Sequence, residues 1–113
     1  MALYRKATIA ASASVSDEVK LSPGETLLCL EMPSGWDAAS ITFTAVVDPD
    51  STTFLNVYDD SGEFTISTAA ASRFIIIPNG ISLSRFKIRS GTSGTPVNQT
   101  AARVIGIITR FVS

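Results

Sequence analysis

The amino-acid sequence predicts an all-β protein, a single-domain antiparallel β-sandwich or jelly roll of about eight strands. Three observations lead to this fold class. Short runs of apolar residues, many alternating with polar ones, recur at spacings of about ten residues. Clusters of Gly, Pro, Asp and Ser separate these runs, and no stretch has a convincing helical period. The 113 residues are enough for one hydrophobic core, with no internal repeat and no linker.

We expect residues 1–16 to form an N-terminal arm or edge strand, ahead of a β-sandwich domain at residues 17–113. Between Leu3 and Ala11 the residues alternate in character, which favours a strand. Arg5 and Lys6 followed by small residues also resemble a weak secretory signal, but the leucine-rich run of such signals is missing. An arm that crosses to a neighbouring subunit is the functional alternative.

Eight further segments have the pattern of strands, each bounded by turn residues. They cover residues 17–21, 26–32, 40–47, 54–58, 63–67, 73–77, 84–90 and 102–112. The turn at residues 59–62 should close a hairpin between the fourth and fifth of them. The Ala-rich stretch at residues 69–71 is too short for a helix of its own.

The pattern within four of these segments predicts which residues share a face. In residues 26–32, Leu28 and Leu30 should lie on one face, opposite Leu27 and Cys29. In residues 40–47, the apolar side chains should face one way: Ile41, Phe43, Ala45 and Val47. In residues 84–90, the bases should lie opposite the apolar residues: Arg85, Lys87 and Arg89 against Phe86 and Ile88. Residues 73–77 are apolar on both faces, which predicts a central strand or an interface strand.

The composition excludes several kinds of site. The sequence has no histidine, so a Ser-His-Asp triad, a Cys-His pair and a histidine-ligated metal are impossible. The single cysteine, Cys29, excludes an internal disulfide. No apolar run approaches the roughly 20 residues of a membrane span, and no Gly-rich phosphate loop is present. We therefore expect a protein that is not an enzyme and has no cofactor, no metal and no membrane partner.

The charges are few and unevenly placed. Only 17% of residues are charged, below the roughly 25% of an average domain, which suggests that other subunits cover part of the surface. Residues 1–63 carry all ten acids and have a net charge of −7, whereas residues 64–113 carry six bases and no acid. The two halves either pair within one subunit or form an acidic and a basic face that dock between subunits.

Several side chains are candidates for binding. Arg85, Lys87 and Arg89 share a strand face with no interleaved aromatic residue, so a subunit or capsid contact, with Arg110, is favoured over nucleic acid. Trp36 after its Pro-Ser-Gly turn is favoured as a plug at one end of the core, although an exposed Trp36 with Tyr58 could stack on a glycan. The acidic turns at residues 48–50 and 59–63 could also bind calcium, but their spacing does not match a calcium loop.

Two stretches together resemble a known group of proteins. Residues 35–43 read Gly-Trp-Asp-Ala-Ala-Ser-Ile-Thr-Phe, and residues 89–99 contain Arg-Ser-Gly-Thr followed by Pro-Val-Asn-Gln. This pairing resembles small β-rich virion structural proteins of tailed bacteriophages and prophages, over roughly residues 25–112. In physical terms the motifs fit scaffold roles: Trp36 capping the core, the loop at residues 90–94 taking positive backbone angles, and Gln99 bonding to backbone groups.

The resemblance implies a structural protein of the virion, assembled in the bacterial host cytoplasm. We expect a capsid decoration protein, a homo-oligomer that binds the outer shell and stabilises it through contacts with the major capsid protein or other virion proteins. Buried apolar strand surface and complementary charges would supply the binding energy. The alternatives are a carbohydrate-binding or adhesion module of a head or tail fibre, and a tail-tube or connector protein.

Overall fold

The computed structural model describes residues 2–78 and 83–111, and these residues form an all-β structure without a helix. Val112 and Ser113, at the end of the expected last strand and domain, lie outside the described residues, as does Met1. The strands are β1 (Ala2–Ile9), β2 (Val19–Lys20), β3 (Glu25–Glu31), β4 (Ile41–Val46), β5 (Leu55–Asn56), β6 (Tyr58–Asp59), β7 (Gly62–Glu63), β8 (Phe74–Ile76), β9 (Arg85–Ser90) and β10 (Arg103–Phe111).

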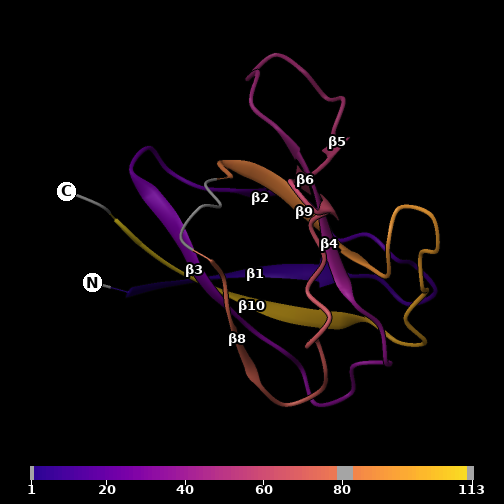
Figure 1. The fold of residues 1–113 in the computed structure, drawn as a ribbon. Helices are drawn as coiled ribbons and strands as arrows, with labels where there is room; N and C mark the ends of the chain where they lie inside the picture. Colours follow the sequence, from indigo (N-terminus) through magenta and orange to yellow (C-terminus); the bar gives the residue numbers. More distant parts are fainter. Residues whose placement is uncertain (1, 79–82, 112–113) are drawn as a thin grey trace.

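Eight of these strands form two four-stranded sheets (Figure 1). Sheet A has the order β1-β10-β3-β8 and sheet B the order β2-β9-β4-β5. All pairings are antiparallel, and four of them are nested along the chain: β1 with β10, β2 with β9, β3 with β8, and β4 with β5. Two further pairings, β10 with β3 and β9 with β4, join these pairs within the two sheets.

Both sheets contribute to one hydrophobic core. Phe43 of β4 packs against Phe86 of β9 edge to face, with the ring centroids 5.8 Å apart. From sheet A, Ile105 and Ile107 are fully buried, as is Ile9 of the N-terminal segment. Residues 2–9 are thus an integral edge strand of sheet A, paired along their length with β10.

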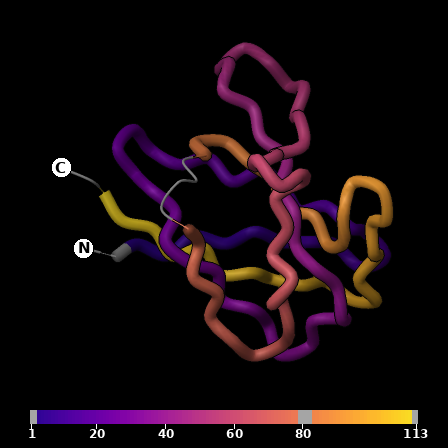
Figure 2. Tube along the Cα trace, in the orientation of Figure 1, coloured from indigo at the N-terminus to yellow at the C-terminus, as the bar shows by residue number. Residues whose placement is uncertain are grey.

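Strand β9 has the alternation that the sequence predicts. Phe86 and Ile88 are fully buried, and the intervening bases are not. Strand β4 departs from a simple alternation in two ways. Thr42 and Thr44 are buried as well as the apolar residues, and Val47, predicted to face the core, is 85% exposed just beyond the strand. There the chain leaves the sheet for the β4–β5 connection, which projects from the body of the molecule (Figure 2).

The predicted faces of β3 are wrong because the strand contains a β-bulge. Ile108 pairs with Cys29, but the next residue, Thr109, pairs with Leu27, so Leu28 is an extra residue in the ladder. An extra residue reverses the alternation that follows it. Leu27 and Leu30 consequently both face the core, whereas the even spacing predicted them on opposite faces.

Strand β8 is not a central strand. It ends sheet A, with β3 as its partner. Ile75 is 6% exposed, but its neighbours Phe74 and Ile76 are 66% and 84% exposed. Of the two interpretations of its apolar faces, the central strand is excluded and the interface strand stays a prediction.

The hairpin at residues 59–62 forms where it was expected. Tyr58 pairs with Glu63 and Asp59 with Gly62, so β6 and β7 are joined by two residues. Gly62 has a φ of 127°, which is available to glycine without strain. The described residues contain no helix long and apolar enough to cross a membrane.

Candidate protein-contact surface

The outer face of sheet A, the side turned away from the core, carries an apolar row across all four strands. The strand register aligns Tyr4, Ile108, Cys29 and Ile76. Tyr4 is 54% exposed, and Ile108 and Cys29 are half-buried. Burial raises the pKa of the Cys29 thiol, which therefore stays neutral and apolar near neutral pH. A row without a charged group is unusual for a face turned to solvent.

The neighbouring row contains the polar groups of this face. It aligns Lys6, Gly106, Glu31 and Phe74. The Tyr4 ring covers Gly106, where an added Cβ would lie 2.7 Å from Tyr4 Cε1. The Tyr4 hydroxyl donates to Glu31 Oε1 at 3.3 Å. The Tyr4 ring is thus held against the sheet at Gly106.

The backbone of β8 is open at its outer side. Met32 N–H donates to Arg73 C=O, and Ile77 N–H donates to Leu28 C=O. In an antiparallel ladder, alternate residues turn their N–H and C=O groups to the same neighbour. Phe74 and Ile76 therefore turn theirs away from β3, toward the edge, and no backbone bond joins them to another residue in the described ranges.

The predicted basic face is largely neutralised within the chain. Arg85 Nε lies 2.9 Å from Glu18 Oε2, and its Nη1 donates to the Asp48 carbonyl. Arg89 lies 3.1 Å from Glu63 Oε2 and also donates to Asn56 Oδ1 at 2.7 Å. Both guanidinium side chains are more than four-fifths buried, so much of their hydrogen-bonding capacity is used within the subunit.

The two other predicted contact bases differ from this pair. Lys87 Nζ lies 4.5 Å from the centroid of the Phe54 ring, a cation–π contact within the subunit. Arg110 is exposed on β10, and no ion pair of it is found within the described ranges. Its register with Thr26 places it beside the apolar row of the outer face. Of the four predicted contact residues, Arg110 alone adjoins that row.

The charge separation along the sequence is resolved by pairing in the fold. Within the described residues, three ion pairs join an acid of residues 1–63 to a base of residues 64–113. They are Glu18–Arg85, Asp37–Arg103 and Glu63–Arg89. Hydrogen bonding from Arg85 lowers the pKa of the Glu18 carboxyl, and bonding from Thr100 and Arg103 lowers that of Asp37. The interpretation as pairing within one subunit is the one that these contacts favour.

The motif residues of the resemblance meet at one end of the molecule. Gln99 is fully buried and bonds to four groups: it accepts from Asp37 N–H and Arg103 Nε, and it donates to Asp37 C=O and Ser90 Oγ. Gly91 has a φ of 89°, and an added Cβ would meet the Thr95 carbonyl at 2.5 Å. These contacts fit the scaffold roles that the sequence predicts for the motif.

Trp36 belongs to the same end and is 6% exposed. Its indole N–H donates to the Ala39 carbonyl at 3.2 Å. A ring buried in this way has no face to stack on a sugar, so the plug is the interpretation that fits. Tyr58 is exposed on the β6–β7 hairpin, and the glycan alternative would rest on it without Trp36.

A partly buried ion pair, in which Glu25 is buried and Arg5 is half-exposed, lies at the opposite end, below the β2–β3 turn. Arg5 donates to both carboxylate oxygens of Glu25, at 2.6 and 2.8 Å. Ser22 N–H and the Thr109 hydroxyl also donate to this carboxylate. Chiefly through the bond from Arg5, the pKa of Glu25 falls from its ordinary 4.5 to about 2. The carboxylate is saturated, which indicates a structural role.

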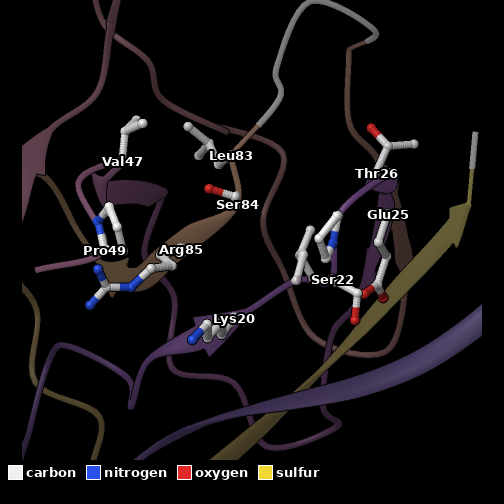
Figure 3. A pocket seen from close by; sticks show the side chains of 12 residues that line it. Lys20, Ser22, Glu25, Thr26, Val47, Pro49, Leu83, Ser84 and Arg85 are labelled. Carbon is white, nitrogen blue, oxygen red and sulfur yellow. The ribbon is translucent and has the colours of Figure 1, made fainter.

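A hollow of about 610 Å³ lies beside this pair, between the β2–β3 turn and the end of β4 (Figure 3). Its walls include Lys20, Val47 and Leu83. The other charged groups on its walls are already occupied, Glu25 by Arg5 and Arg85 by Glu18. A binding pocket needs convergent polar groups that are free to orient a ligand. Among the described wall residues, Lys20 is the one charged group without an ion-pair partner, so charged groups do not converge on a ligand.

The acidic turns use their carboxylates for local hydrogen bonds. Asp48 Oδ1 accepts from Asp50 N–H, and Asp59 Oδ1 accepts from Ser61 N–H. In the described parts of the chain, no three potential ligands cluster to hold a metal ion.

Comparisons with protein-family models, with curated proteins and with solved structures found no match.

Sequence reasoning missed the outer face of sheet A as a unit. It identified residues 73–77 as apolar on both faces, but Tyr4, Cys29 and Ile108 come from three other strands. Their alignment depends on strand order and register, which local periodicity does not contain. The signal that was present is the apolar character of both faces of β10 around Ile107 and Ile108.

Proposed function

We propose that this protein is a structural protein of a phage virion, a capsid decoration protein that binds the outer shell and stabilises it. Its partner would be the major capsid protein, met during assembly in the bacterial cytoplasm. The observation that carries the proposal is the apolar outer face of sheet A, which ends in the uncharged edge strand β8. Such a surface is suited to protein contact, because the Tyr4–Ile108–Cys29–Ile76 row contains no charged group, and covering that row buries apolar area without desolvating a charge.

The strand order supports a jelly roll as the fold behind this function. The first strand pairs with the last, the second with the next to last, and so on inward along the chain. A long hairpin that is rolled up produces this nested pairing. Jelly rolls of eight strands form many viral capsid domains, and also lectin domains. Because a fold does not decide between these functions, the proposal rests on the surface, where Trp36 has no face to offer a sugar.

The contact differs in kind from the one that the sequence suggested. Arg85 and Arg89 are engaged within the subunit, so complementary charge is a minor contribution. Apolar burial over the Tyr4–Ile108–Cys29–Ile76 row supplies the energy, at roughly 25 cal/mol per Å² of apolar surface covered. Lys6 and Arg110 at the border of the row would orient the protein on an acidic shell.

The test is the copy number of the protein in purified virions, measured by quantitative mass spectrometry against the major capsid protein. We expect a fixed ratio that approaches one copy per capsid subunit. A handful of copies per particle would move the protein to a fibre, a connector or the baseplate. Complete absence from the particle would overturn the virion assignment.

A variant pair connects this occupancy to the surface. Ile108→Lys places a charge in the centre of the apolar row, and Val47→Lys places one on an exposed site outside sheet A. We expect Ile108→Lys to leave the fold intact, by circular dichroism, and to lower the occupancy of capsids at least about tenfold. Val47→Lys should bind as the unmodified protein does. Equal binding by both variants would remove the outer face from the proposal.

A further inference from the structure

The open edge of β8 combines two features that a strand partner would satisfy. Phe74 and Ile76 turn their backbone N–H and C=O groups outward, and the same two residues expose large apolar side chains. Exposed edge groups of this kind are a template for another strand. A partner that contacts only the side chains of β8 would leave its outward N–H and C=O groups bonded to water. A partner strand forms hydrogen bonds with these groups.

We propose that a second copy of this chain pairs with β8, antiparallel, about a twofold axis through Ile75. The two copies of sheet A then form one eight-stranded sheet, in which β8 meets β8. This inference goes beyond the proposed function and does not depend on it, since the pairing needs no capsid.

The register of β8 is self-complementary about Ile75. The outward groups lie one residue to each side of it, at Phe74 and Ile76. A twofold axis through Ile75 places Phe74 opposite Ile76 of the partner subunit, and Ile76 opposite Phe74 of the partner subunit. Both are hydrogen-bonded pairs, which exchange two N–H···O bonds each. Each also sets an aromatic ring against a β-branched side chain, a favourable cross-strand combination.

The residues around β8 limit this pairing to a short segment. The next outward position is Pro78, which has no N–H to donate. On the other side, Arg73 is exposed and puts a charge next to the strand. An isologous pair of this length closes on itself, because the edge is used up in one contact. The pairing therefore yields a dimer and not a fibre.

The charges near the edge do not oppose a second copy. Positions 74–77 carry none, so no like charges meet across the axis. The apolar row of the outer face ends at Ile76, which would meet Phe74 of the partner subunit, so the two outer faces become continuous. Any strand bonds to the outward backbone groups, but a second copy also supplies a large apolar side chain at both paired positions, Phe74 against Ile76.

The first test is the mass of the protein in solution, by sedimentation equilibrium over a range of concentrations. We expect a monomer–dimer equilibrium. Ile76→Lys should weaken dimerisation by about tenfold, because both cross-strand pairs lose their apolar contact. Val47→Lys is the matched control, since Val47 is 85% exposed and Ile76 is 84% exposed. It should leave the equilibrium unchanged.

A second test examines the register itself. Phe74→Glu alone and Ile76→Lys alone should each weaken the dimer. The two changes on one chain place each Glu opposite a Lys of the other copy, so the double variant should dimerise again, and salt should weaken it. Both sites are exposed, and circular dichroism would verify that each variant is folded.

The outcomes separate this inference from the decoration proposal. A protein that stays monomeric at every concentration, or a double variant that does not recover, overturns the twofold pairing. If a monomeric protein still binds capsids and loses binding with Ile76→Lys, the edge takes a capsid segment instead, which overturns the second copy as occupant. A protein that dimerises in solution but is absent from virions would support the β8 pairing and overturn the proposed decoration function.

Discussion

The two edges of sheet A differ in how their outward backbone groups are treated. On β1, Asp17 N–H donates to Thr8 C=O, so Thr8 and, by alternation, Lys6 and Tyr4 turn their groups away from β10. Asp17 Oδ1 accepts from Thr8 N–H at 2.8 Å, which closes that end of the edge. Lys6 adds an exposed charge in the middle. Both are devices that natural sheets use against unwanted pairing.

The edge at β8 has neither device within its three residues. Its outward positions are Phe74 and Ile76, and no polar side chain in the described parts of the chain caps them. The contrast shows that two edge strands of the same sheet can differ in how well their outward backbone groups are protected. A sheet that caps one edge and leaves the other apolar presents the second edge for contact.

The two edges also differ in how they are anchored. Arg5 of β1 reaches over to Glu25 of β3 through two hydrogen bonds in a buried site. Strand β8 is held by its three-residue pairing with β3 and by the burial of Ile75. The β1 edge is thus held by a polar anchor, the Arg5–Glu25 ion pair. The β8 edge is held by an apolar anchor, the buried side chain of Ile75.

The largest effect that we expect comes from breaking the polar anchor. Glu25→Gln removes the negative charge from a site that contains Arg5, and should lower the free energy of unfolding by about 3 kcal/mol. The measurement is urea unfolding at neutral pH. Glu31→Gln is the control, because Glu31 is exposed on the outer face and is expected to matter by less than about 0.5 kcal/mol. Equal effects of the two changes would contradict the anchor.

Acid should weaken the same anchor in the unmodified protein. The pKa of Glu25 is about 2 in the folded state and 4.5 ordinarily, so the unfolded chain binds more protons between these values. The stabilisation is complete above about pH 5 and is lost as the pH falls from 4.5 toward 2. It amounts to on the order of 3 kcal/mol, at 1.36 kcal/mol per pKa unit.

Urea unfolding between pH 6 and pH 2.5 measures this loss. The pKa values of Glu18 and Asp37 are also lowered, so they add to the slope in the same direction. Glu25→Gln should therefore have a shallower profile, with part of the slope remaining. A variant profile as steep as that of the unmodified protein would assign the acid sensitivity to the other carboxylates.

A smaller change should open the protected edge. Asp17→Ala removes the acceptor of Thr8 N–H and is expected to cost about 1 kcal/mol. Hydrogen exchange followed by NMR gives the local result: the Thr8 amide should exchange as fast as the outward amide of Lys6. The amide of Ala7, which faces β10, should stay slow. Unchanged protection at Thr8 would show that another group caps this edge.

How far the sequence predicts this structure depends on whether one face of a strand is polar. Strand β9 is predicted correctly, because its bases and apolar residues alternate without interruption. The bulge at Leu28 defeats the same logic in β3, since a ladder irregularity leaves no mark in the pattern. For β8, apolar residues on both faces are compatible with a central strand and with an exposed edge, and only the strand order decides.

The candidate site is less accessible to sequence reasoning than the fold. The basic residues of β9 were visible, but their partners Glu18 and Glu63 are 67 and 26 residues away. Long-range pairing of this kind depends on the topology. The scaffold roles of Gln99 and Trp36 were predictable. Both residues lie near turns, where a side-chain amide and an indole N–H find backbone groups as hydrogen-bond partners.

The smallest expected effect on stability is also the most specific test of the two edges. Ile76→Lys gives β8 the outward charge that Lys6 gives β1, at a site that is 84% exposed. The free energy of unfolding, measured at a concentration where the protein is monomeric, should change by less than about 0.5 kcal/mol. Ile75→Ala, one residue away but buried, should cost about 3 kcal/mol. An exposed apolar residue that can be replaced without loss of stability is not needed for folding, which leaves it available for contact. A loss for Ile76→Lys comparable to that for Ile75→Ala would mean that the edge serves the core, and the difference between the two edges would then have no bearing on binding.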